Sequence, residues 1–244
     1  MFNFFSRKRE PQPLFFNTDV HCHVLPGIDD GSPDAEVSVE LIGRMAAWGI
    51  ERIVASPHVT FGTFENTAES VAAARDALAA ASAGKEGFPA VENWAEYRID
   101  DLFLKRLEQN DLMTRPGGFI LIENSFMQEP WNLDQLVFDL QVKGLRPVLA
   151  HPERYTYYYN KKARYRALHD AGLLFQINLL SLADAYGGAE KHIAEYLIEN
   201  DMVDFVGSDL HRRRHADAID AYLASKDYLK HRAALDGRLL NGQL

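Results

Sequence analysis

The 244-residue sequence predicts an α/β fold in which seven parallel strands close into a barrel. Three observations lead to this prediction. Short apolar segments alternate with helix-like segments along the chain, as in repeated strand-helix units. The apolar segments are continuous rather than alternating, which is expected of strands buried on both faces. Nearly every apolar segment is followed by a side chain that can bind a metal ion.

The seven predicted strands are short apolar segments, and each is followed by polar or turn-forming residues. They span residues 14–20, 52–55, 90–94, 118–122, 147–150, 174–178 and 205–207. Their lengths are typical of strands rather than of helices.

Seven predicted helices alternate with these strands. They span residues 32–48, 67–83, 100–109, 133–143, 161–171, 190–200 and 216–225. The first opens with Ser32, Pro33 and Asp34, which place a proline in the first turn beside capping side chains. The second is rich in alanine, the strongest helix former.

The residues that follow the strands favour a closed barrel over an open sheet. In chain order they are His21 and His23, His58, Glu96, Glu123, His151, the segment 178–181, and Asp209 with His211. A barrel gathers the carboxyl ends of all its strands around one mouth, where its active site lies. An open sheet would spread the same residues along a line, and they could not share one site.

Two pairs of these residues give the strongest indication of a metal site. His21 and His23 follow the first strand, and Asp209 and His211 follow the last. Side chains at positions i and i+2 of an extended segment point to the same face. Each pair therefore presents two ligands side by side, and the barrel brings both pairs together.

The predicted ligand set is too large for one ion. It comprises His21, His23, Asp30, His58, Glu96, Glu123, His151, Asp209 and His211. Nine ligands suit two or three divalent ions that share carboxylates, since one zinc ion takes about four. Nitrogen and oxygen donors without thiolate fit Mn²⁺, Fe or Zn²⁺, of which we expect Mn²⁺. The remaining histidines are interpreted as surface or structural residues: His169, His192, His215 and His231.

Composition excludes several classes of protein. The formal net charge of −9 argues against a protein that coats nucleic acid. The single cysteine, Cys22, permits no internal disulfide and is typical of a reducing compartment. No apolar run approaches the roughly 18 residues of a membrane-spanning helix, and the first ten residues do not form a signal peptide. We therefore expect a cytoplasmic location.

Residues 1–13 are expected to form a leader ahead of a single domain at residues 14–244. The leader holds three aromatic residues followed by three basic ones: Phe2, Phe4, Phe5, Arg7, Lys8 and Arg9. Apolar anchors beside basic residues bind anionic membrane surfaces. The leader could therefore bring the protein to the inner face of the membrane, or it could be disordered.

The segments around the predicted ligands resemble a known family. The sequence is similar to the polymerase-and-histidinol-phosphatase (PHP) superfamily, and within it to the bacterial protein-tyrosine phosphatases of capsule and exopolysaccharide operons. The matching segments are residues 19–31, 55–58, 95–97, 121–123, 150–155 and 207–211. Two of them, His-x-His-x-Leu-Pro-Gly-x-Asp-Asp-Gly and His-Pro-Glu-Arg-Tyr, are specific to this branch.

The resemblance implies a distorted (β/α)7 barrel of the PHP type with three metal ions. The first ion would be held by His21, His23, Glu96 and Asp209. Glu96 would bridge to a second, completed by Glu123 and His151. The third would be held by Asp30, His58 and His211. Arg154 would bind the phosphate, together with a second arginine among Arg212, Arg213 and Arg214, of which Arg214 has the nearest spacing.

The implied partner is the phosphotyrosine tail of a membrane-bound bacterial tyrosine kinase. Four tyrosines after the His-Pro-Glu-Arg motif could stack on the substrate ring or could pack inside the protein: Tyr155, Tyr157, Tyr158 and Tyr159. Alternatives are a PHP phosphoesterase acting on a small molecule such as histidinol phosphate, a metal-dependent amidohydrolase, and a non-catalytic protein on a degenerate barrel. A cysteine phosphatase is excluded, because Ile28 stands where Cys22 would require an arginine.

Overall fold

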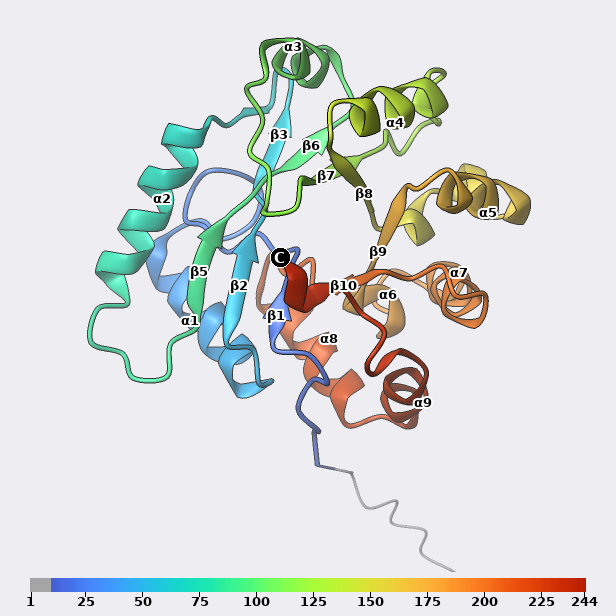
Figure 1. Cartoon of the computed structure of the whole chain (residues 1–244). Helices are drawn as coiled ribbons and strands as arrows, with labels where there is room; N and C mark the ends of the chain where they lie inside the picture. Colours follow the sequence, from blue (N-terminus) through green and yellow to red (C-terminus); the bar gives the residue numbers. More distant parts are fainter. Residues whose placement is uncertain (1–9) are drawn as a thin grey trace, which may run out of the picture.

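The computed structural model describes residues 10–244, in which helices surround a central set of strands (Figure 1). The leader residues Phe2, Phe4, Phe5 and 7–9 lie outside the described part. The strands are β1 Thr18–Asp19, β2 Arg52–Ala55, β3 His58–Thr60, β4 Phe64–Glu65, β5 Ala90–Asn93, β6 Glu96–Arg98, β7 Phe119–Glu123, β8 Arg146–Ala150, β9 Leu174–Asn178 and β10 Phe205–Gly207. The helices are α1 Ala35–Ala47, α2 Ala68–Ala81, α3 Asp101–Gln109, α4 Leu133–Val142, α5 Lys162–Asp170, α6 Leu179–Leu182, α7 Gly188–Glu199, α8 Arg213–Leu223 and α9 Lys226–Leu235.

The strands form two sheets, in the orders β1-β2-β5 and β10-β9-β8-β7-β6-β3-β4. Every pairing is parallel except that of β3 with β4. Only two residues separate β2 from β3, and two separate β5 from β6, so each pair is one interrupted strand. Pro57 lies in the first interruption and has no amide proton to donate to a ladder.

The first and last strands close the barrel. Cys22 and Leu210 form a parallel bridge, and the amide of His23 donates to the carbonyl of Leu210 at 3.0 Å. The amide of Asp209 donates to the carbonyl of His21 at 2.8 Å. With the two interrupted strands counted once each and the short antiparallel strand β4 left out, seven strand positions surround the interior. The predicted distorted (β/α)7 barrel is therefore confirmed.

The boundaries differ from the prediction at several elements. The predicted strand 14–20 pairs as a strand only over Thr18–Asp19, and β3, β4, β6, α6 and α9 were not predicted. Ser225 is not the last residue of a helix, because its side chain accepts from the amide of Tyr228 and caps α9. Helix α8 begins three residues earlier than predicted, which places the arginines at 212–214 at its start.

The barrel interior below the strand ends is apolar. Along β7, Phe119 and Leu121 belong to a small buried cluster that also contains Val148, while Ile120 and Ile122 face the larger core beneath the helices. Because alternate residues of a strand share a face, Glu123 continues the inward line of Phe119 and Leu121. The ligands at the strand ends thus lie directly above an apolar layer of the barrel interior.

None of the helices within residues 10–244 has the length and hydropathy needed to cross a bilayer.

Candidate metal centre

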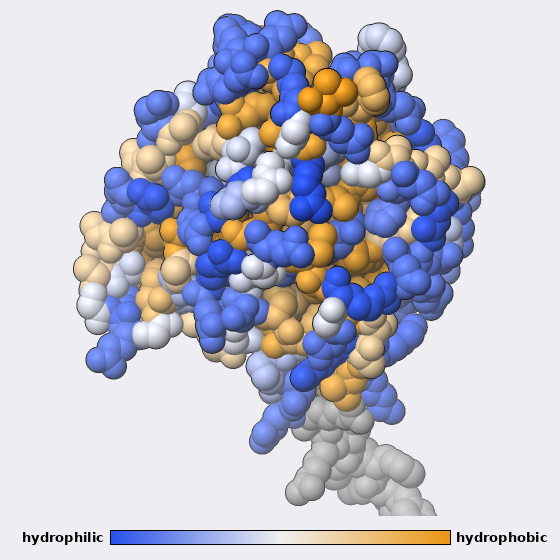
Figure 2. Space-filling view, in the orientation of Figure 1, coloured by the Kyte–Doolittle hydropathy of each residue, from blue (hydrophilic) through white to orange (hydrophobic). Residues whose placement is uncertain are grey.

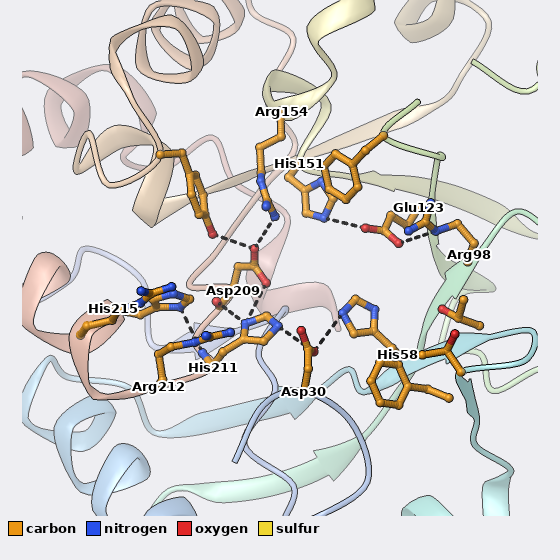
Figure 3. A pocket seen from close by; sticks show the side chains of 16 residues that line it. Asp30, His58, Arg98, Glu123, His151, Arg154, Asp209, His211, Arg212 and His215 are labelled. Carbon is orange, nitrogen blue, oxygen red and sulfur yellow. Dashed lines mark hydrogen bonds and ion pairs between the residues drawn. The ribbon is translucent and has the colours of Figure 1, made fainter. Parts of the chain in front are cut away.

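All nine predicted ligands lie together at the carboxyl ends of the strands. Eight of them come from six strand positions around the barrel, and Asp30 comes from the loop between β1 and α1. Figure 3 shows how the more accessible ones converge on one cavity. Its volume is about 550 Å³, and six of the nine ligands line it: Asp30, His58, Glu123, His151, Asp209 and His211. His21, His23 and Glu96 lie deeper and are fully buried.

Glu96 lies at the centre of the cluster. Its Oε2 atom is 3.4 Å from Nε2 of His21, 3.4 Å from Nε2 of His23 and 3.0 Å from Nδ1 of His58. Nevertheless, this buried oxygen makes no hydrogen bond to any residue in the range 10–244. A buried carboxylate oxygen without a partner is costly. A cation among these nitrogen atoms would satisfy it, so the donor set fits a metal ion.

The two histidines after β1 are oriented to offer their Nε2 atoms. Nδ1 of His21 lies 2.6 Å from Oε1 of Gln176, and Nδ1 of His23 lies 2.8 Å from Oδ2 of Asp29. Each oxygen accepts a hydrogen bond from an Nδ1–H group, and this tautomer leaves a lone pair on Nε2. The two Nε2 atoms are 3.2 Å apart. Two facing lone pairs are stabilised by a shared cation.

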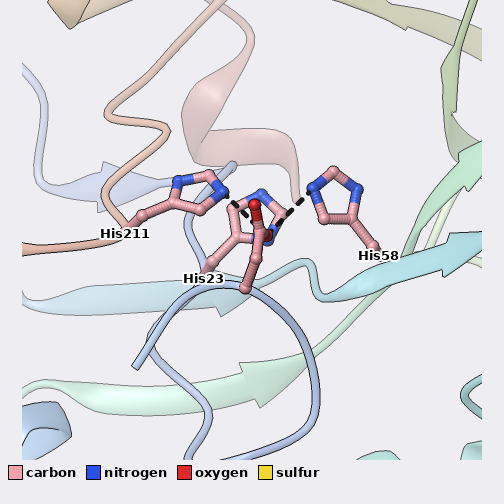
Figure 4. Close-up of side chains that lie close together, drawn as sticks. His23, His58 and His211 are labelled. Carbon is pink, nitrogen blue, oxygen red and sulfur yellow. Dashed lines mark ion pairs between the residues drawn. The ribbon is translucent and has the colours of Figure 1, made fainter. Parts of the chain in front are cut away.

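Three overlapping groups of ligand atoms could each hold an ion, with all atoms of a group within 4.8 Å of one another. The groups are His21, His23 and Glu96; His58, Glu96 and Glu123; and His23, Asp30, His58 and His211. Figure 4 shows the last group. His23, His58 and Glu96 each belong to two groups, so the ions would be neighbours that share ligands.

His151 and Asp209 complete the neighbourhood of these groups. Nε2 of His151 lies 3.0 Å from Oε1 of Glu96 and 3.6 Å from Oε1 of Glu123. Oδ1 of Asp209 lies 3.6 Å from Nε2 of His21 and 3.5 Å from Nε2 of His23. These groups differ from the implied ligand sets: His58 lies in the group with Glu96 and Glu123, and His23 joins the group around Asp30. Asp209 and His151 lie beside the groups and not within them.

The electrostatics of the cluster favour bound positive charge. Burial alone would lower the pKa of His21, but the carboxylates of Glu96 and Asp209 outweigh it and raise the pKa to about 9. The pKa of His23 is likewise raised against burial, by Asp29 and Glu96. The carboxylates therefore attract more positive charge than neutral imidazoles supply. A divalent ion would compete with protons for these nitrogens.

For two ligands that line the cavity, His151 and Glu123, burial decides the direction of the pKa shift. Burial lowers the pKa of His151 to about 4, although its hydrogen bond to Glu96 acts against this, so its imidazole is neutral near pH 7. Burial and then the charge of Glu96 raise the pKa of Glu123 to about 7. Arg98 donates to Oε2 of Glu123 at 2.9 Å and favours its ionised form. A neutral imidazole and an ionised carboxylate are the forms that bind metal.

Asp209 is held by three donors on one of its oxygens. Arg154, Asn178 and Tyr186 donate to Oδ2 at 3.1, 2.6 and 3.0 Å. Oδ1 is thereby turned toward the histidines. The guanidinium of Arg154 lies between two rings, 4.9 Å from the centroid of Phe126 and 4.2 Å from that of Tyr186. Arg154 is thus fixed at the cavity wall by an ion pair and two cation–π contacts.

Arg212 and Arg214 both line the cavity. Arg213 points elsewhere, and its guanidinium forms an ion pair with Glu40 of α1. The preferred Arg214 therefore lies at the cavity, although Arg212 does as well. His215 also lines the cavity, and its Nδ1 lies 3.4 Å from the amide of His211. The prediction that His215 is a surface or structural residue did not place it at the cavity.

The four tyrosines after the His-Pro-Glu-Arg motif do not line the cavity. Of the two alternatives, the structure therefore favours packing inside the protein over stacking on a substrate ring. Tyr155 and Tyr158 are fully buried, and the hydroxyls of Tyr157 and Tyr159 bond Ser125 and Glu190. The aromatic residues at the cavity are instead Phe64, Phe126 and Tyr186. Tyr186 could not be predicted as a cavity residue, because no motif surrounds it. Asp29 could have been suspected, since it is the neighbour of Asp30 in the same motif.

The chain is similar to several known proteins. A family model described as "Capsular polysaccharide synthesis, CpsB/CapC" matches residues 17–230. The tyrosine-protein phosphatase YwqE of Bacillus subtilis (strain 168) is 35% identical over 195 residues, which cover 79% of this chain and 76% of YwqE. The tyrosine-protein phosphatase CpsB of Streptococcus pneumoniae is 29% identical over 212 residues, which cover 79% of this chain and 82% of CpsB.

Two solved structures are similar to the chain. One belongs to the crystal structures of YwqE from Bacillus subtilis and CpsB from Streptococcus pneumoniae, which are described as metal-dependent tyrosine phosphatases. It has a TM-score of 0.78 and 31% identity, and covers 89% of this chain and 93% of the other. The second is histidinol phosphate phosphatase from Lactococcus lactis, with a TM-score of 0.54, 16% identity, and coverage of 88% and 93%. At that identity the likeness concerns the fold alone.

Proposed function

The chain belongs to the CpsB/CapC family of capsular polysaccharide synthesis proteins, and from that premise we propose that it is a metal-dependent protein-tyrosine phosphatase. It is a phosphoric monoester hydrolase that removes phosphate from tyrosine. One observation carries the chemistry. Oε2 of Glu96 is surrounded by three imidazole nitrogens without a hydrogen bond, directly below a cavity lined by arginines.

Three groups of residues would hold the ions. His21, His23, Glu96 and Asp209 would hold the first; Glu96, Glu123 and His151, with His58 nearby, the second; and Asp30, His58 and His211 the third. We propose Mn²⁺ among the ions that nitrogen and oxygen donors fit, which also include Fe and Zn²⁺. Cys22 is buried in the core outside the cluster and supplies no thiolate ligand. When bound, such ions lower the pKa of coordinated water and neutralise the charge of the phosphate.

The chain's own residues would position the ester. Arg154, which is already held by Asp209 and two rings, would donate to the phosphate oxygens. Arg214 or Arg212 would approach from the opposite wall. Phe64 and Phe126 would contact the phenyl ring. A phenolate leaving group has a pKa of about 10, so it needs less acid assistance than an alkoxide.

The proposed substrate is the phosphotyrosine tail of a membrane-bound bacterial tyrosine kinase, reached from the cytoplasmic side. The family's place in capsular polysaccharide synthesis supports this partner. The cavity is also wide enough, at about 550 Å³, to take an aryl phosphate on a flexible segment.

A panel of four substrates tests the function: para-nitrophenyl phosphate, a phosphotyrosine peptide, a phosphoserine peptide of the same sequence, and histidinol phosphate. We expect hydrolysis of the first two, loss of activity with chelator and recovery with Mn²⁺. Faster hydrolysis of histidinol phosphate than of the phosphotyrosine peptide would favour the small-molecule alternative. Activity that chelator leaves unchanged would contradict the metal site.

A further inference from the structure

A second groove lies beside the cavity and has no part in the chemistry described above. It has a volume of about 530 Å³. Its apolar walls come from the start of α3 and from the loop between β7 and α4: Ile99, Leu104, Met127, Pro130 and Trp131. Figure 2 shows hydrophobic residues at the surface between these two helices.

Two apolar residues of the groove are almost fully exposed. Met127 is 88% exposed and Trp131 is 96% exposed. Methionine and tryptophan are enriched at the centres of protein interfaces, and tryptophan dominates their binding energy. Adjacent exposed side chains of this kind mark a binding surface rather than an ordinary surface residue.

The loop that presents these residues is held in place. The amide of Asn124 donates to the hydroxyl of Tyr155 at 2.9 Å, and the hydroxyl of Tyr157 donates to the carbonyl of Ser125 at 3.0 Å. Glu129 forms an ion pair with Arg164 of α5. Arg164 also forms an ion pair with Asp134 in the first turn of α4 at 2.9 Å. The loop is therefore anchored at both ends, and Met127 and Trp131 lie between the outermost anchors.

The groove adjoins the active-site cavity, because residues that are neighbours in the chain line the two hollows. Phe126 lines the cavity while its neighbours Ser125 and Met127 line the groove. Arg98 lines the cavity while its neighbour Ile99 lines the groove. The guanidinium of Arg98 lies 5.7 Å from the centroid of the Phe126 ring. These two side chains lie between the two hollows, so a polypeptide that occupied both would cross them.

The charges of the two hollows differ. The cavity is lined by Arg98, Arg154, Arg212 and Arg214, which suit a phosphate. The lining of the groove has no lysine or arginine among the described residues, and it includes the carboxylates of Asp100 and Asp101. The groove therefore suits apolar side chains and disfavours acidic ones.

We propose that this groove binds the polypeptide next to the phosphotyrosine, through an apolar side chain that packs between Met127 and Trp131. The proposal rests on the proposed tyrosine-phosphatase function and extends it to the substrate sequence. The phosphate occupies the arginine-lined cavity, the backbone crosses the Arg98–Phe126 wall, and a neighbouring apolar residue fills the groove. Substrates with acidic residues at that place are hydrolysed more slowly.

Kinetics with matched variants test the groove. We expect Trp131→Ala and Met127→Ala to lower kcat/KM about tenfold for a phosphotyrosine peptide with flanking leucines, which corresponds to about 1.4 kcal/mol. Turnover of para-nitrophenyl phosphate should not change, because it cannot reach the groove. Phe138→Ala is the control, since Phe138 is 59% exposed on α4 and does not line the groove. The preference for leucine over aspartate in the peptide should shrink in Trp131→Ala.

Fluorescence provides a readout that is independent of turnover. Trp48 and Trp94 are buried, so acrylamide should quench mainly Trp131. A non-hydrolysable phosphonate analogue of the leucine peptide should protect Trp131 from acrylamide, whereas phenyl phosphonate should not. Equal protection by both, or no protection by either, would overturn the proposal.

The possible outcomes distinguish a failure of the groove proposal from a failure of the proposed function. If wild-type protein hydrolyses neither aryl phosphate nor peptide, the proposed function fails and the groove proposal fails with it. If all variants hydrolyse the peptide like wild type, the function stands and the groove proposal is wrong. If Trp131→Ala changes only the molecular mass in light scattering, from an oligomer to a monomer, the groove binds a second copy of the chain and not the substrate.

Discussion

His58 and Glu96 are paired residues on the parallel strands β3 and β6, and their side chains meet with Nδ1 of His58 3.0 Å from Oε2 of Glu96. The register of the barrel therefore determines the centre of the metal site. The same oxygen faces Nε2 of His21 and of His23 from the first strand. Ligands from three strands converge on one carboxylate, and substitutions that shift a strand should disturb metal binding.

Gly31 should be required for this alignment. A Cβ atom at Gly31 would lie 2.1 Å from the carbonyl oxygen and 2.5 Å from the Cβ of His23, so the backbone that carries His23 would have to move. We expect Gly31→Ala to lower bound metal and phosphatase activity by at least about tenfold. Gly43→Ala on α1 is the matched control, because nothing lies within 4 Å of its added Cβ. It should raise the free energy of unfolding by about 0.5–1 kcal/mol and leave activity unchanged. Equal metal content in both variants would contradict the argument.

Arg154 should act on phosphate rather than on metal. We expect Arg154→Ala to lower kcat/KM about 10- to 150-fold, since a charge-assisted hydrogen bond contributes about 1.5–3 kcal/mol. Tyr186→Phe keeps the ring against Arg154 and should have a smaller effect than Tyr186→Leu, which removes it. Metal content, measured by mass spectrometry, should stay at the wild-type value. Loss of metal in Arg154→Ala would instead make Arg154 a residue that holds Asp209 in place.

Glu153 of the His-Pro-Glu-Arg motif has a structural role. Its buried Oε1 accepts from the amide of Asn178 at 2.8 Å and from the hydroxyl of Ser181 at 2.6 Å. Glu153→Ala leaves both donors unsatisfied and should lower the free energy of unfolding by about 1–3 kcal/mol. Glu153→Gln keeps an acceptor and should cost less, because burial already raises the pKa of Glu153 to about 7. Urea denaturation of both variants measures the difference. Equal losses would show that the charge, and not the acceptor, matters.

The metal-free protein should lose stability as the pH rises from 7 to 9. The pKa of His21 in the folded protein is raised to about 9, above its ordinary 6.5, so the protonated form stabilises the fold and this contribution disappears as the proton leaves. The loss should be at most about 3 kcal/mol. With metal bound, the nitrogen carries no proton and the effect should be absent. Thermal unfolding with and without chelator across this range measures it, and identical pH profiles would exclude it.

Much of the site could be predicted from the sequence because its ligands sit at fixed places on regular elements. His21 with His23, and Asp209 with His211, have the i, i+2 spacing that an extended chain turns to one face. A barrel then brings distant strand ends to one mouth. The residues that orient these ligands could not be predicted in the same way. Gln176 precedes its strand end by two positions and resembles any polar strand residue.

Other features could not be predicted because tertiary contacts create them. Strands β3 and β6 have three residues each and begin with a ligand, so they contain no apolar run to detect. Tyr186 comes from the irregular segment after α6, and only the fold brings it to Arg154. Likewise, a run of tyrosines after Arg154 does not reveal which of them face the core. Burial of Tyr155 and Tyr158 is decided by the loop and helix that cover them.

The most direct test is the metal content and the phosphatase activity of Glu96→Gln, measured on the same folded preparation. Glutamine keeps the size of the side chain but removes the charge that faces the three histidines. We expect far-ultraviolet circular dichroism like that of wild type, fewer metal ions per chain, and turnover of para-nitrophenyl phosphate at least about 100-fold lower. Glu108→Gln, at an exposed carboxylate on α3, should match wild type in all three. A folded Glu96→Gln protein with wild-type metal content and turnover would contradict the Glu96-centred site.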